Sequence, residues 1–231
     1  MRDKLITFIF VLVAIATPGS HASAATIEPA VNINLDNRLA ITALIEKLRA
    51  ELNATDSATL FLEGWCSRYG LGSPAKIVAQ RMAGEVPLSA QQRQELEISD
   101  PQEPVIYRRV ALACGDTVLS EADNWYLPRR LTPEINMVLT ETNAPFGRAI
   151  QSLGPSRRTL SSILTWRALP REWELMSTSQ LTAEVATAPL VTYDPANALF
   201  ENRAIVLRRD GTPVSEVRET YKMSLIAFRF R

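Results

Sequence analysis

The first residue whose type and position suggest chemistry is Arg109, which lies inside a predicted β-hairpin. Residues 105–114 and 117–127 alternate as strands do, and Gly115 between them suits a tight turn. If a two-residue turn sets the register, Arg109 lies opposite Ala122. A guanidinium among small neighbours can bind a carboxylate, because its planar fork donates parallel hydrogen bonds. The alternative is an arginine on the solvated face of a half-buried sheet.

A second candidate is Glu219, in the last predicted strand of the chain. Residues 203–208 and 213–223 form another predicted hairpin, and Val217, Glu219 and Tyr221 share one face of its second strand. A carboxylate between a valine and a tyrosine costs stability unless it is paired or protonated. Glu219 is therefore a candidate ion-pair partner or acid.

The absence of histidine after His21 limits the chemistry that the rest of the chain can do. It excludes Ser-His-Asp and Cys-His nucleophile systems, so acid–base steps would need carboxylates, lysine, tyrosine or water. Cys66 and Cys114 are too few soft ligands for a zinc site, and we expect no metal and no cofactor. The pair leaves two alternatives, a disulfide or two small buried hydrophobic side chains.

Residues 1–24 have the pattern of a secretory signal peptide. Arg2 and Lys4 precede an apolar run at residues 5–16, and small residues at 22–24 offer a cleavage site. The run is shorter than the ~20 residues that span a bilayer, and no cysteine follows it directly. We therefore expect a periplasmic or secreted protein without a stable membrane anchor.

Residues 25–231 are long enough for one domain with a substantial core. They carry 23 basic and 24 acidic residues without a basic run, so we expect no nucleic-acid partner. Helical patterns come first and strand patterns later, which predicts a single α+β domain with an antiparallel sheet. Residues 169–195 contain three prolines and are expected to form a loop or lid. Further helices are expected from about residue 36 to 52 with Asp36 as the candidate cap, and from the candidate caps Asp56 and Ser57 to Gly70. Others are expected at 89–96, at 131–142, where Thr132 can be the cap and Pro133 fits the first turn, and at 146–150. Further strands are expected at 75–82 and 159–167.

Four motifs occur in a fixed order between residues 56 and 223. They are RVALACGD at 109–116, WYLP at 125–128, PFGR at 145–148, and GTP at 211–213 leading to RETY at 218–221. This order resembles the chorismate lyase family, which releases pyruvate from chorismate and shares its fold with ligand-sensing domains of bacterial repressors. The resemblance implies about six antiparallel strands with helices packed around a small buried ligand cavity.

The resemblance also implies roles for individual residues. Arg109 would hold the ring carboxylate of the ligand, and Glu219 would lie at the other end as the catalytic acid. Phe146 and Gly147 would line the pocket, and Ala58 matches a further lining position.

One position departs from the family pattern. Asn124 stands where the family has a second arginine, so Arg130 or Arg158 would have to supply the missing cation.

Three functions from different classes remain open on the sequence. The first is an exported lyase that eliminates pyruvate from chorismate or a related aromatic or enol-ether carboxylate. The second is a periplasmic binding module for a small aromatic carboxylate, because chorismate is a cytosolic metabolite. The third is an envelope interaction protein that keeps the fold with a closed core.

Overall fold

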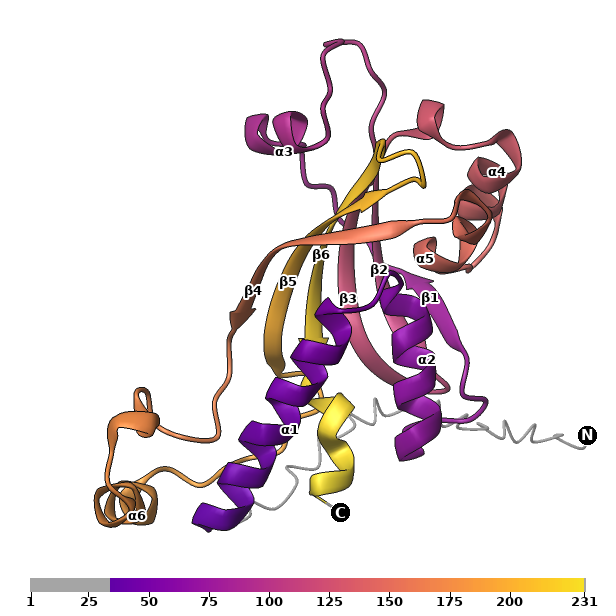
Figure 1. Cartoon of the computed structure of the whole chain (residues 1–231). Coiled ribbons are helices and arrows are strands. Elements are labelled where there is room, and N and C mark those ends of the chain that lie inside the picture. Colours follow the sequence, from indigo (N-terminus) through magenta and orange to yellow (C-terminus); the bar gives the residue numbers. More distant parts are fainter. Residues whose placement is uncertain (1–33, 231) are drawn as a thin grey trace, which may run out of the picture.

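The computed structural model describes residues 34–230 as one α+β domain built on a six-stranded antiparallel sheet (Figure 1). The predicted fold class is confirmed. The strand order is β1-β2-β3-β6-β5-β4. The strands are β1 (Ile77–Arg81), β2 (Ile106–Cys114), β3 (Thr117–Tyr126), β4 (Ser156–Leu164), β5 (Ala198–Leu207) and β6 (Pro213–Lys222). The predicted signal peptide lies outside the described residues, and no helix within 34–230 is long and apolar enough to cross a membrane.

Helices α1 and α2 lie on one face of the sheet, and η4 at the C-terminal end of the described chain packs against both of them (Figure 1). The α-helices are α1 (Leu35–Asn53), α2 (Ala58–Tyr69), α3 (Ala90–Glu95), α4 (Pro133–Glu141), α5 (Phe146–Ala149) and α6 (Thr178–Thr187). Four short 3-10 helices are η1 (Pro128–Arg130), η2 (Gln151–Leu153), η3 (Trp173–Leu175) and η4 (Met223–Arg229). Ser57, one of the two candidate caps, caps α2. The predicted cap of α1 is wrong: Asn34 and not Asp36 is its cap, so α1 begins two residues earlier than a cap at Asp36 implies.

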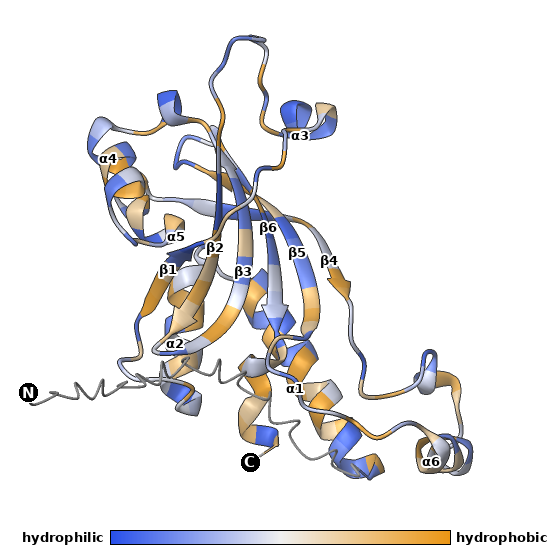
Figure 2. Ribbon diagram, turned by 180° about the vertical axis from the view of Figure 1, so that it is seen from behind, coloured by the Kyte–Doolittle hydropathy of each residue, from blue (hydrophilic) through white to orange (hydrophobic). Residues whose placement is uncertain are grey.

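The two faces of the sheet differ in polarity. The face under α1 and α2 forms the main core, in which the buried Trp65 donates its indole N–H to the carbonyl of Leu225 at 2.9 Å. In the described residues no helix covers the middle of the opposite face, where hydrophilic positions follow the strands (Figure 2). The opposite face is also covered in part, because Glu216 on this face is fully buried and accepts a hydrogen bond from Arg203.

The predicted hairpin between β2 and β3 is present, but its predicted register is wrong. Cys114 pairs with Thr117 across the two-residue turn, and the pairing then shifts because Leu119 of β3 is an extra residue in the ladder. Arg109 consequently lies opposite Asp123 instead of Ala122, and Arg108 lies opposite Asn124. The bulge could not be read from the turn residues alone.

Cys66 and Cys114 form a disulfide, the first of the two alternatives that the sequence left open. Their Cα atoms lie 6.6 Å apart, and 48 positions separate them in the chain. The bond joins α2 to the end of β2 and so fixes two elements whose other ends meet at the pocket described below.

Candidate anion-binding pocket

A small pocket lies between the core face of the sheet, the N-terminus of α2 and the segment around α5. Its volume is about 50 Å³. Val110, Leu112, Val206 and Val217 form its apolar floor on the sheet, and Phe146 closes it from α5. The pocket is therefore a narrow, mostly apolar space into which a few polar groups project.

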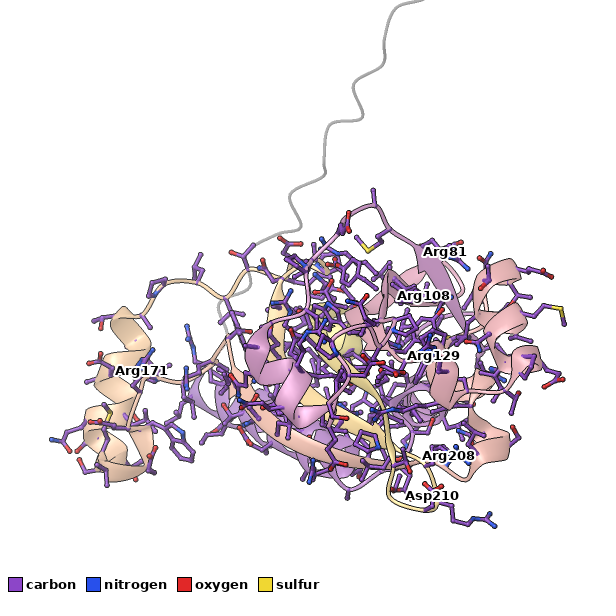
Figure 3. All side chains as sticks on the ribbon, turned by 90° about the horizontal axis from the view of Figure 1, so that it is seen from above. Arg81, Arg108, Arg129, Arg171, Arg208 and Asp210 are labelled. Carbon is purple, nitrogen blue, oxygen red and sulfur yellow. A yellow bond between two sulfur atoms is a disulfide. The ribbon has the colours of Figure 1, made fainter. Side chains whose placement is uncertain are left out.

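Arg108 is the first cation of this pocket. The residue is buried, and its Nη2 donates to the carbonyl of Ala144 at 3.0 Å, while its buried Nε has no partner among the described residues. Burial, together with the nearby charge of Arg81, lowers the pKa of Arg108 below its ordinary value. Figure 3 shows Arg81 and Arg108 on the same side of the molecule. An anion beside Arg108 would relieve this unfavourable environment.

Arg157 is the second cation, and it reaches the pocket from the edge strand β4. Its side chain is 3% exposed, and its Nη2 donates to Glu219. Its Nε and Nη1 are buried without a partner in the described part of the chain. Burial opposes its charge, but the carboxylate of Glu219 and the hydroxyl of Tyr221 outweigh that effect, so the pKa of Arg157 is raised.

Glu219 lies on the core face of β6, as its alternation with Val217 and Tyr221 predicts. Its Oε2 accepts hydrogen bonds from Arg157 and from the Tyr221 hydroxyl, the latter at 2.9 Å. Burial and the charge of Glu219 raise the pKa of Tyr221 well above its ordinary value, so this hydroxyl stays a donor. Glu219 is thus the ion-pair partner of Arg157, and its role as a catalytic acid stays a prediction.

The N-terminus of α2 forms the wall opposite the sheet. Ala58 and Thr59 are the first residues of this helix, whose first-turn N–H groups have no acceptor within the helix. Gly147 of α5 approaches closely, because a Cβ on it would lie 2.9 Å from Thr59 Oγ1 and 3.2 Å from Ser57 Oγ. A helix N-terminus that faces two arginines adds to the positive potential of the pocket.

Asn124 on β3 is a further polar residue on the core face of the sheet that lines the pocket. It is buried beside Arg108, and its Oδ1 accepts a hydrogen bond from the Ser215 hydroxyl. The acceptor is therefore engaged, and the amide N–H₂ group is the part of Asn124 that can donate to a ligand.

Five of the six predicted site residues line this one pocket: Ala58, Asn124, Phe146, Gly147 and Glu219. Their binding roles stay predictions.

The expectation that Arg109 and Glu219 share a cavity is wrong. Arg109 lies on the opposite face of the sheet, where its side chain is 36% exposed. Its Nη2 lies 3.3 Å from Glu121, and its Nε lies 3.8 Å from Asp123. Arg109 therefore lies on the solvated face of the sheet, which was the alternative interpretation of this residue.

The cations that do line the pocket were missed in the sequence, although a signal for one of them was present. Arg108 alternates with Val110 and Leu112 and so shares the more apolar face of its strand, where an arginine needs an explanation. Arg157 fell outside the predicted strand at 159–167, because β4 begins at Ser156.

Neither residue that was expected to supply the missing cation does so. Arg130 donates to the carbonyls of Leu96 and Pro213, each at 2.8 Å, and Arg158 is exposed.

The predicted lid at 169–195 is also wrong, since this segment does not line the pocket. It contains α6, whose Leu181 and Val185 pack with Leu35 and Leu39 at the start of α1. The segment around α5 covers the pocket instead. Within residues 34–230 no cluster of three or more histidine, cysteine, aspartate or glutamate side chains could hold a metal ion.

The fold and the pocket define an α+β protein with a small pocket that is lined by two arginines, Arg108 and Arg157, and by Glu219, which is paired with Arg157. Uncharacterized protein y4mC of Sinorhizobium fredii (strain NBRC 101917 / NGR234) is 40% identical over 194 residues, which cover 83% of this chain and 79% of that protein. The chain belongs to the same family as this protein. No family model matches the chain.

Solved structures with a related arrangement include two domains of transcriptional regulators. The effector domain of PhnF from Mycobacterium smegmatis is 14% identical, with a TM-score of 0.42 over 72% of this chain and 88% of that chain. The ligand-binding domain of a putative GntR-family regulator from Bordetella bronchiseptica is 16% identical, with a TM-score of 0.37 over 63% of this chain and 82% of that chain. These similarities are too low to carry any inference about what this chain binds or does.

Proposed function

We propose that the protein binds a small organic carboxylate in the pocket between Arg108 and Arg157. The observation that carries the proposal is that Arg157, which lines the cavity, has two buried donors without a partner among the described residues, Nε and Nη1. Buried donors without acceptors cost free energy, and a carboxylate oxygen supplies an acceptor for such a donor. The unpartnered Nε of Arg108 gives the anion a further donor.

The charge balance of the pocket supports a monoanion. The charged residues that line the pocket are Arg108, Arg157, Glu219 and Asp56. Asp56 is exposed to solvent, so the buried charges are two arginines and one glutamate, and one carboxylate neutralises their single positive charge. The apolar floor suits a hydrocarbon group on this carboxylate, and the resemblance to chorismate lyase makes that group an aromatic ring. Because the cavity volume is about 50 Å³, far below the ~300–1,000 Å³ of pockets for drug-sized ligands, an aromatic acid requires the α5 segment to move outward.

A thermal-shift experiment tests the proposal with acetate, pyruvate, benzoate, 4-hydroxybenzoate and chorismate as probes. Binding to the native state raises the melting temperature. We expect the shift to disappear in Arg108→Gln and to persist in Arg109→Gln, a neighbour that lies on the other face of the sheet. Circular dichroism confirms that both variants fold. No shift with any probe, or equal loss in both variants, would overturn the proposal.

A more specific alternative to binding alone is that the protein converts chorismate and releases pyruvate, and the resemblance of the motifs to chorismate lyase favours it. The same protein is incubated with chorismate, and pyruvate release is measured. Glu219 is engaged as an ion-pair acceptor, so we expect binding without pyruvate release. Release that Glu219→Gln abolishes would instead establish the lyase.

We also propose that the protein works in the periplasm or outside the cell. The Cys66–Cys114 disulfide supports this, because disulfides persist in oxidising compartments. Fusing residues 1–40 to a reporter that is active only after export tests the proposal. A reporter that stays inactive and unprocessed would count against it.

A further inference from the structure

The two edges of the sheet are treated differently by the rest of the chain. At the β1 edge, Ala79 N–H donates to the carbonyl of Asn143 at 3.0 Å, and Ile77 N–H donates to Glu63 Oε1 at 2.9 Å. These contacts cover the short outer strand with α2 and the α4–α5 connection. This edge is therefore closed, as natural sheets commonly close theirs.

The β4 edge is open along most of its nine residues. No backbone hydrogen bond joins its outer side to another described segment, and its one outward contact is Arg49 Nη2 donating to the carbonyl of Ser162 at 3.0 Å. In an antiparallel strand the N–H and C=O of one residue point the same way, so the N–H of Ser162 also points outward. The strand contains no proline between residues 156 and 164. It is thus competent to pair with another strand.

A broad groove of about 700 Å³ runs beside this open edge, between α1, the end of β4 and the segment 165–175. In Figure 1 the segment with η3 and α6 extends away from the sheet as an arm. Two of the most exposed large apolar side chains in the described residues flank this groove: Ile163 at 58% and Leu175 at 80%. One exposed apolar side chain on the open strand, Ile163, and one on the arm, Leu175, fit a protein–protein contact surface at this edge.

The charges of the arm identify the partner. Arg167, Arg171, Glu172 and Glu174 are exposed, and none of them forms an ion pair within the described residues. Figure 3 shows Arg171 on the arm, apart from the body of the domain. Two cations and two anions form a neutral, self-complementary patch, which a two-fold axis can place against its own copy. A strongly acidic or basic partner would face like charges on half of it.

We infer that the protein forms a two-fold symmetric dimer in which β4 pairs antiparallel with β4 of a second copy. The arms then lie across the junction, with their apolar side chains in the contact and their charges paired between copies. The same operation joins two six-stranded sheets into one continuous sheet and buries both open edges.

Sedimentation velocity of the purified protein over a range of micromolar concentrations tests the inference. We expect the mass of two chains. Ile163→Lys combined with Leu175→Lys places ammonium groups in the contact and should shift the mass to one chain. Met137→Lys is the matched control, because Met137 is also exposed, at 53%, but lies on α4 away from this edge.

Each outcome decides the inference. The unfolding transition of every variant shows that it is folded, which is expected because the changed side chains are exposed. A wild-type protein that stays monomeric at every concentration overturns the dimer. A dimer that withstands both lysines but not Met137→Lys overturns the assignment to β4 and the arm.

Discussion

Arg157 on β4 and Glu219 on β6 form an ion pair that crosses β5, and their side chains are only 3% and 7% exposed. The pair holds the Glu219 carboxylate in place, while two further donors of Arg157, a residue that lines the pocket, have no partner in the described part of the chain. One arginine thus serves both the stability of the sheet and the candidate ligand site.

Replacing only one of these two charged residues should lower the free energy of unfolding more than replacing both. Arg157→Met leaves the Glu219 charge buried and unpaired, so we expect a loss of roughly 3–5 kcal/mol in the free energy of unfolding. Adding Glu219→Gln should recover part of that loss. Lys47→Met removes an exposed pair with Glu51 as the control, and should cost at most about 1 kcal/mol. Urea unfolding measures all three; equal losses in the single and double variants would contradict the coupling.

The contact between α5 and α2 depends on the absence of a side chain at position 147. In Gly147→Ala the new Cβ would meet Thr59 Oγ1 at 2.9 Å, so α5 or Thr59 must shift. We expect a loss of roughly 1–3 kcal/mol in stability, as for other overpacked sites, and weaker binding of any carboxylate that raises the melting temperature.

Gly64→Ala is the control for this change, since nothing lies within 4 Å of the added carbon and Gly64 is in the interior of α2. It should raise the stability by up to ~1 kcal/mol, because alanine favours the helix. Chemical unfolding distinguishes the two glycines, and a Gly147→Ala protein as stable as the wild type would disprove the close contact.

The Cys66–Cys114 disulfide should contribute strongly to stability. It closes a loop with a sequence separation of 48, for which the chain-entropy relation gives roughly 4 kcal/mol. We expect the double variant Cys66→Ala with Cys114→Ala to unfold at a correspondingly lower urea concentration than the wild type. Adding a reducing agent should lower the urea midpoint of the wild type but not that of the variant. A reducing agent that destabilises both proteins equally would show that it acts elsewhere.

Stability should respond to pH through Glu216, whose side chain is fully buried on β6. Burial raises its pKa, although Arg203, whose Nη2 donates to it at 2.7 Å, opposes the shift. A carboxyl with a raised folded-state pKa contributes stability below its unfolded pKa, and this contribution is lost as the pH rises through the folded value.

The comparison with Glu216→Gln isolates this effect from other carboxyls, such as Glu121, whose pKa is lowered by Lys222. The wild type should gain stability relative to the variant as the pH falls from neutral towards the ordinary glutamate pKa. Urea unfolding across this interval measures the difference, and parallel pH profiles for the two proteins would show that Glu216 does not titrate there.

Local patterns predicted much of the fold because they are set by neighbours in the chain. Ser57 caps α2, Thr132 and Pro133 begin α4, and Gly115 makes the hairpin turn. The α+β class and the core-facing position of Glu219 follow from the same periodicities.

The site was predicted less completely because its geometry depends on pairing between strands. Leu119 adds one residue to β3, and this bulge places Arg109 opposite Asp123. Alternation already puts Arg108 and Arg109 on opposite faces, but the helices that cover one face decide which of the two is buried.

The sequence by itself determined most of the elements, although not α6, together with the absence of histidine beyond residue 21 and an arginine and a glutamate among apolar neighbours. Only the tertiary structure decided that Arg157, 62 positions before Glu219, is the partner of that glutamate. The reason is physical: the energy of an ion pair depends on distance and burial in space, and strand order and register bring these two charges together, whereas no local pattern in the chain links them.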